Sequence, residues 1–149
     1  MEFVHEVTAH LDNKPGRLAK ICSALAHEKI NIQALAVMQT PEHSVLRLVT
    51  EDAVPTRKVL TSLGTESDVC EVLAVEMENR PGALAKVLET LAEEHIHVEY
   101  AYVAPGTVPG KSLGIFHTSN PKRALKVLQE PASINGADRS SDRRPLHSR

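Results

Sequence analysis

The chain repeats itself, and this duplication constrains its fold more than any other feature. The segment that begins at Asn13 returns at Asn79, and 11 of the 25 residues over 13–37 are identical in 79–103. Beyond the next loop the offset grows from 66 to 68 residues, because the second copy has two additional residues in its loop over 104–110. Gaps between related segments fall in loops. We therefore expect two copies of one structural unit.

Both copies show the same order of strand and helix patterns. Apolar residues in the first copy recur at the spacing of one helix face, at Leu18, Ile21, Cys22 and Leu25. Helices are predicted from Gly16 through Leu25 and over 54–63, 82–94 and 121–128. Strands are predicted over 3–11, 30–38, 44–50, 68–70, 72–77, 98–103 and 111–118.

This order predicts an α+β fold of two tandem ferredoxin-like βαββαβ sandwiches, with antiparallel sheets and helices on one face. The expected domains are residues 1–70 and 71–130, followed by a disordered tail over 131–149, where apolar content is low. The last strand of the second copy is expected to be short or missing. Since units of this size have marginal cores, we expect the halves to support each other by sheet pairing, helix packing or dimerisation.

Composition argues against several classes of function. The formal net charge is −2, which does not favour a nucleic-acid binder driven by bulk charge. No apolar run reaches the length of about 18 residues that a membrane helix needs. Two cysteines are too few for a disulfide framework. These features predict a cytoplasmic protein that contacts neither nucleic acid nor membrane.

An Asn-x-Pro-Gly element joins a strand to a helix in each copy, at 13–16 and 79–82. The first turn of a helix leaves backbone N–H groups unpaired and carries partial positive charge. Gly16 and Gly82 lack a Cβ, so a ligand can approach the backbone closely. These properties suit a small carboxylate. The same residues also suit a turn that only ends a strand and starts a helix.

The segments 12–19 and 30–32, repeated as 78–85 and 96–98, resemble the signature of the ACT domain. Up to Leu128 the chain is similar to the stand-alone tandem-ACT proteins of bacteria. The resemblance implies small regulatory modules that bind amino acids at interfaces between domains and transmit this binding to a linked enzyme or regulator.

The resemblance to serine-binding ACT domains also implies particular ligand contacts. In that family, the Asn of the turn and a second Asn eighteen positions later contact the ligand. These positions are Asn13 and Asn31 in the first copy, and Asn79 and His97 in the second. The predicted ligand-binding residues are Asn13, Lys14, Pro15, Gly16, Arg17, Leu18, Asn31, Asn79, Gly82 and His97.

A family histidine two positions before the first Asn is replaced by Leu11 and by Met77. The resemblance therefore implies two unequal sites, of which the first copy, with both asparagines, is the better one. The identity of the amino acid stays open.

The resulting prediction is a non-enzymatic sensor that binds a small amino acid at ACT–ACT interfaces, forms a homodimer and needs no cofactor. The alternative is a ligand-free adaptor or regulatory subunit that modulates an enzyme of amino-acid metabolism in trans. A metal site at His95 and His97 is less favoured, because these residues align with ordinary polar residues in the first copy. Catalysis by Cys22 is disfavoured, since this residue falls on the apolar helix stripe.

Overall fold

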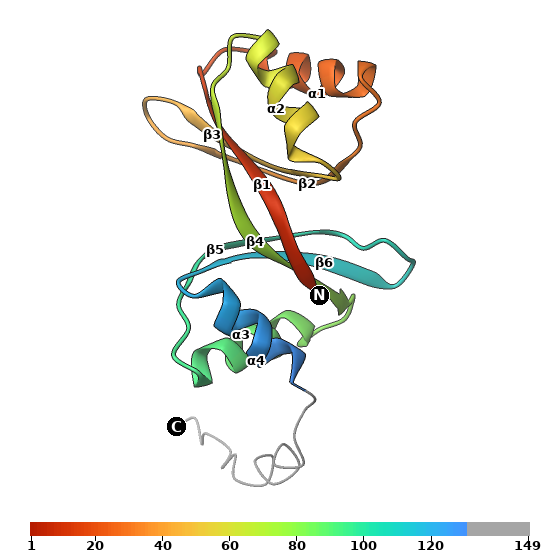
Figure 1. Ribbon diagram of the computed structural model, residues 1–149, viewed down its shortest axis with the longest axis vertical. Helices are drawn as coiled ribbons and strands as arrows, with labels where there is room; N and C mark the ends of the chain where they lie inside the picture. The colour runs from red at the N-terminus through yellow and green to blue at the C-terminus, as the bar shows by residue number, and fades with distance from the viewer. Residues whose placement is uncertain (131–149) are drawn as a thin grey trace, which may run out of the picture.

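The computed structural model describes residues 1–130, so the predicted tail over 131–149 lies outside the described residues. It contains one antiparallel sheet and two pairs of helices (Figure 1). The elements are β1 (Glu2–Leu11), α1 (Arg17–His27), β2 (Ile32–Gln39), β3 (Ser44–Thr50), α2 (Ala53–Ser62), β4 (Ser67–Glu78), α3 (Ala83–Glu93), β5 (Val98–Pro105), β6 (Lys111–Thr118) and α4 (Pro121–Gln129).

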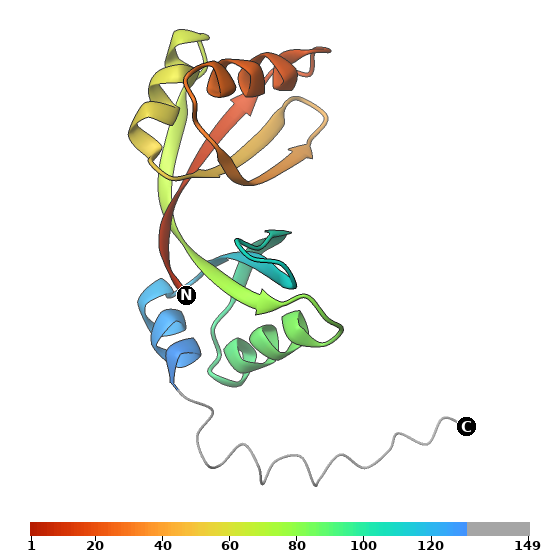
Figure 2. The same cartoon turned by 90° about the vertical axis from the view of Figure 1, so that its right-hand side faces the viewer.

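The sheet has the order β2-β3-β1-β4-β6-β5, and every neighbouring pair is antiparallel. Its twist divides the molecule into two lobes, one carrying α1 and α2 and the other α3 and α4 (Figures 1 and 2). Each lobe is a ferredoxin-like sandwich, as the repeat predicted. The central strands β1 and β4 run side by side through both lobes (Figure 1).

The two short strands expected over 68–70 and 72–77 are one continuous strand, β4, over Ser67–Glu78. Its first part pairs with β1, in a register that joins Ala9 to Ser67. Its last part pairs with β6, from Leu73 to Glu78. The strand continues through Cys70 because it serves as the last strand of the first lobe and the first strand of the second.

The last strand of the second lobe comes from the beginning of the chain. Glu2 pairs with Ala74 and His5 with Glu71, so the start of β1 flanks β4 in the second lobe. The second lobe then has the strand order β5-β6-β4-β1, which matches β2-β3-β1-β4 in the first. The place that the last strand of a βαββαβ unit takes is therefore filled by β1 in the second lobe.

Three apolar clusters stabilise this arrangement. The first packs Val7, Ala9 and Leu11 of β1 beneath α1 and α2. The second packs β4 and β6 beneath α3 and α4, and Phe3 at the start of β1 packs against it. Phe3, Val7, Ala9 and Leu11 are separated by even numbers of residues, so their side chains lie on one face of β1. Both helix pairs therefore cover the same face of the sheet.

The third cluster lies on the face of the sheet that carries no helix. It brings Ala34 of β2 together with Val49, Val72 and Ala74, and Tyr102 of β5 packs against it. The two edge strands, β2 and β5, therefore approach each other across this face. The third cluster belongs to neither lobe alone and joins them.

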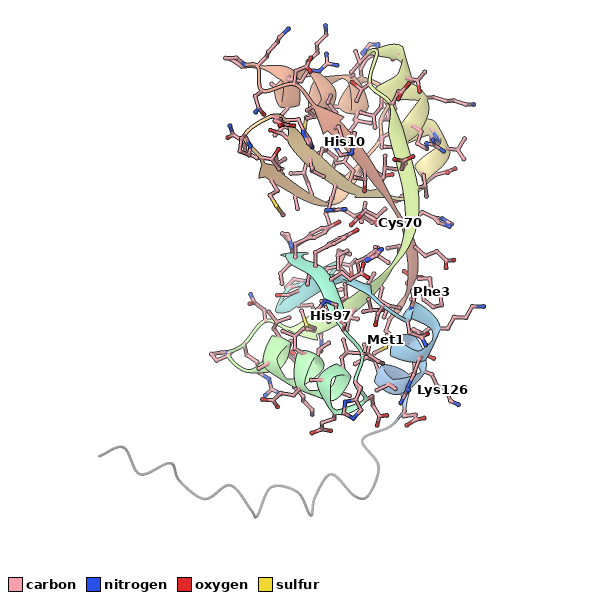
Figure 3. All side chains as sticks on the ribbon, turned by 90° about the vertical axis from the view of Figure 1, so that its left-hand side faces the viewer. Met1, Phe3, His10, Cys70, His97 and Lys126 are labelled. Atoms are coloured by element: carbon pink, nitrogen blue, oxygen red, sulfur yellow. The ribbon has the colours of Figure 1, made fainter. Side chains whose placement is uncertain are left out.

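The second lobe should depend on the first residues of the chain. We expect Phe3→Ala to lower the free energy of unfolding by about 2 kcal/mol, because a half-buried aromatic ring is lost from the core beside α4 (Figure 3). Hydrogen exchange should accelerate in α4 and β6 before it accelerates in α1 and α2. His5→Ala, at an exposed position on the same face of β1, is the control and should change little. Loss of protection in the first lobe alone would contradict the shared-strand arrangement.

Candidate functional site

The two helix entrances have the same backbone geometry. Gly16 precedes α1 with a φ of 83° and Gly82 precedes α3 with a φ of 88°. Both values are left-handed, which favours glycine. At each entrance a backbone bond closes the turn, from Lys14 N–H to the Asp12 carbonyl at 2.8 Å and from Arg80 N–H to the Glu78 carbonyl at 3.0 Å. The duplicated element therefore folds in the same way twice.

No side chain of the described residues caps the helix at either entrance. Within residues 1–130, the backbone N–H groups of Leu18 and Ala19 have no hydrogen-bond partner, and the same holds for Leu84 and Ala85. These groups lie in the first turn, where the helix dipole is positive. Each entrance therefore offers two free donors to an anionic group.

A cavity of about 320 Å³ lies beside the first entrance. Its wall includes Asn13, Lys14, Pro15, Arg17 and Leu18, five of the predicted ligand-binding residues. Val37 and Gln39 of β2 close its other side. Its volume is at the lower end of the range for small-molecule sites.

The side chain of Asn13 is held by the chain itself. Its Nδ2 donates to the Thr40 carbonyl at 3.3 Å, and its Oδ1 accepts from Ser44 Oγ at 2.7 Å. Both partners belong to the β2–β3 hairpin. In the second copy, Asn79 bonds the matching hairpin only through its backbone N–H, which donates to the Gly110 carbonyl at 2.9 Å. Asn13 thus fastens its loop to a neighbouring hairpin, and Asn79 does so without its side chain.

Within a single copy, the two predicted polar residues lie far apart. Asn13 precedes α1 and Asn31 follows it, and a helix of 11 residues is about 16 Å long. Asn79 and His97 are separated in the same way by α3. A ligand that contacts both members of a pair would need a second ACT-like module beside the first.

The histidines at 95 and 97 do not share a strand. His95 has a φ of 56° in the turn after α3, and the backbone N–H of His97 donates to Ser119 Oγ at 3.2 Å. Among the residues that the structure describes, no three His, Cys, Asp or Glu side chains gather in a way that suits a metal ion.

Comparisons with known proteins agree with this geometry. Residues 2–135 match the family described as the ACT domain pair. The chain belongs to this family. A search of curated proteins found no significant match. In residues 1–130, no helix is both long and apolar enough to cross a membrane.

Solved structures give the same result for the fold. A protein from Bacteroides thetaiotaomicron is 30% identical, with a TM-score of 0.78, over 86% of this chain and 88% of that one. The ligand-free regulatory subunit of aspartate kinase from Thermus thermophilus is 16% identical, with a TM-score of 0.64, over 86% and 95% of the two chains. The corresponding subunit from Thermus flavus is 17% identical, with a TM-score of 0.60, over 85% and 92%. The last two comparisons show the fold of this ACT pair and not its ligand.

A buried polar cluster joins the two ACT modules, and the sequence analysis did not find it. Glu6 of β1 is fully buried, and its carboxylate accepts hydrogen bonds from the hydroxyls of Tyr100 and Tyr102, the latter at 2.6 Å. The guanidinium of Arg47 on β3 lies 3.5 Å from Glu6 Oε1 and 3.7 Å from the centre of the Tyr100 ring. Cys70 of β4 lies at the same level between the lobes, with Sγ 3.7 Å from Glu6 Oε1 (Figure 3). Strands of both modules thus meet at one carboxylate.

A sequence signal for this cluster exists, although it is weak. Tyr100 and Tyr102 are the only tyrosines, and their spacing places them on one face of β5. Burial raises the pKa of both hydroxyls, and hydrogen bonds to the Glu6 carboxylate raise it further. Burial is also the main cause that raises the pKa of the Cys70 thiol. The cluster therefore favours the protonated forms of both tyrosines and of the Cys70 thiol.

Tyrosine absorbance should report directly on this cluster, because the chain has no tryptophan and no other tyrosine. In the folded protein, the absorbance change at 295 nm should begin well above pH 10, the ordinary pKa, and should coincide with unfolding. Since the folded pKa is raised, the stability that the hydroxyls contribute is fully present below pH 10 and is lost as the pH rises above it. The urea-unfolded chain is the control and should titrate near pH 10. Normal titration of both tyrosines in the folded chain would contradict the cluster.

Proposed function

We propose that this ACT pair is a non-enzymatic regulatory protein that binds a small amino acid through the strand-to-helix loop of its first module. The observation that carries the proposal is the cavity beside that loop, next to a helix turn with free N–H donors. Such donors bind a carboxylate without any charged side chain. The N–H groups near Gly16 and Leu18 would hold the ligand carboxylate, and Lys14 adds positive charge at the rim.

Completion of the site requires a neighbouring module. Asn31 lies at the other end of α1, so it would contact a ligand bound at the loop of a second molecule. A homodimer in which modules pack beside each other would supply this contact. The second module, with Asn79, Gly82 and His97, would form a different and weaker site. Binding that favours one arrangement of modules over another is the basis of regulation.

A second candidate is an adaptor that acts without a ligand. The engagement of both polar atoms of Asn13 by the β2–β3 hairpin favours it, because this amide is then not free for a ligand. Two proteins with the same fold are regulatory subunits of aspartate kinase. An enzyme of amino-acid metabolism is therefore a reasonable partner to test under either proposal.

The two entrances provide a matched pair of variants. Gly16→Ala and Gly82→Ala each place a Cβ in open space at a left-handed φ, so each should cost about 1 kcal/mol of stability through backbone strain. We expect at least one of the twenty amino acids to bind in calorimetry and to raise the melting temperature. Gly16→Ala should weaken this binding more than Gly82→Ala does, because only the first loop borders the cavity described above.

Two results would count against the sensor proposal. One is a folded protein that shows neither heat nor a melting shift with any amino acid. The other is an equal loss of binding in both glycine variants. The adaptor proposal instead expects a stoichiometric complex with an enzyme and no response to amino acids.

A further inference from the structure

A second and larger cavity, of about 560 Å³, lies at one end of the first lobe. It is bordered by the start of α1, the end of α2 and the start of β4. Its size is typical of small-molecule sites. It lies within a single module, so it is complete without a neighbouring chain.

Two guanidinium groups border this cavity, and neither has an acidic partner. Arg17 Nη2 donates to Thr65 Oγ1 at 2.7 Å and to the Leu63 carbonyl at 3.3 Å, while its Nε is buried without any hydrogen-bond partner. Arg57 donates to the Ser67 carbonyl at 2.7 Å and to its hydroxyl at 3.3 Å. Within residues 1–130, no carboxylate lies at ion-pair distance from either arginine. A guanidinium without a counter-ion is suited to bind a carboxylate.

Three carboxylates border the same cavity, from Asp12, Glu66 and Asp68. None of them forms an ion pair in the described part of the chain. A ligand with several negative charges would be repelled by these groups, and a simple cation by the arginines. A cavity bordered by both positive and negative side chains fits a small molecule that carries one positive and one negative charge.

The repeat supplies an internal comparison. Arg17 aligns with Ala83 and Arg57 aligns with Leu125, so the second module has neither guanidinium at these places. Its helices α3 and α4 nevertheless form and pack in the same way. A module of this fold can therefore form without an arginine at either position, and both arginines are a feature of the first module alone.

We propose that this cavity binds a small zwitterion, with its carboxylate on Arg17 and Arg57 and its ammonium group toward Asp12, Glu66 and Asp68. Thr61 and Ser67 also border the cavity. The site shares Asp12 and Arg17 with the cavity beside the strand-to-helix loop, but its other wall is formed by the end of α2 and by residues 64–68. It does not require a ligand to bind beside the loop.

The test uses the ¹⁵N-labelled full chain and each of the twenty L-amino acids as zwitterionic probes. We expect at least one to shift the amide resonances of Gly64 and Thr65 in a saturable way. Its amine analogue, which lacks the carboxylate, and its acid analogue, which lacks the ammonium group, should each bind about tenfold more weakly. Equal binding of either analogue would overturn the proposal without any variant.

Arg57→Gln should also weaken binding about tenfold. This side chain is exposed, and within residues 1–130 its hydrogen bonds go to Ser67 alone, so the variant should fold, as its melting curve will show. Arg123→Gln removes an exposed arginine of α4 and is the matched control, with unchanged binding expected. Unchanged binding by a folded Arg57→Gln chain would overturn the proposal.

The resonances also separate this proposal from the one on the loop. Shifts at Val37 and Gln39, which border only the cavity beside the loop, without shifts at Gly64 and Thr65 would overturn the cavity site and leave the loop proposal standing. Shifts at Gly64 and Thr65 without shifts at Val37 and Gln39 support the cavity and count against the loop. No shift in either place would overturn both.

Discussion

The antiparallel pairing of β1 with β4 is the constraint on which the rest of the structure depends. Each strand is long enough to serve in both modules, so β4 ends one sandwich and begins the next, while β1 begins one and completes the other. Small modules of this size bury limited apolar surface alone. Sharing the two central strands gives each module a full sheet and joins the modules by backbone hydrogen bonds. The arrangement of the two helix pairs on one face follows from this pairing.

The helix-free face adds a second connection of a different kind. Glu6 is buried where the two modules meet, and its cost of burial is offset by hydroxyl donors from β5 and by the guanidinium of Arg47. A buried carboxylate without these partners would destabilise the fold. The hydrogen bonds between Glu6 and the two tyrosines therefore fix the position of β5 relative to β1. A change in one module that displaced β1 or β5 would therefore also shift residues of the other module. Regulation by a pair of modules requires this kind of coupling.

The duplicated entrances show how the same local geometry can acquire different surroundings. Both loops leave first-turn N–H groups free, but only the first carries an arginine directly after its glycine. Arg17 borders both the cavity beside the loop and the cavity at the end of the lobe. Both cavities therefore lie beside the first entrance, while the second module contributes Tyr100 and Tyr102 to the cluster at Glu6.

The sequence by itself determined the two-copy βαββαβ fold and the entrance loops, because apolar periodicity, Pro-Gly turns and the repeat are local signals. Strands over 44–50 and 111–118 were predicted with their observed limits. Only the tertiary structure decided that two short strands at Cys70 are one, and that β1 takes the place of the last strand in the second lobe. It also decided that Glu6 meets Tyr100, and that Asn13 and Asn31 lie at opposite ends of a helix. Strand exchange between modules and contacts across more than ninety residues depend on long-range pairing, which no local pattern encodes.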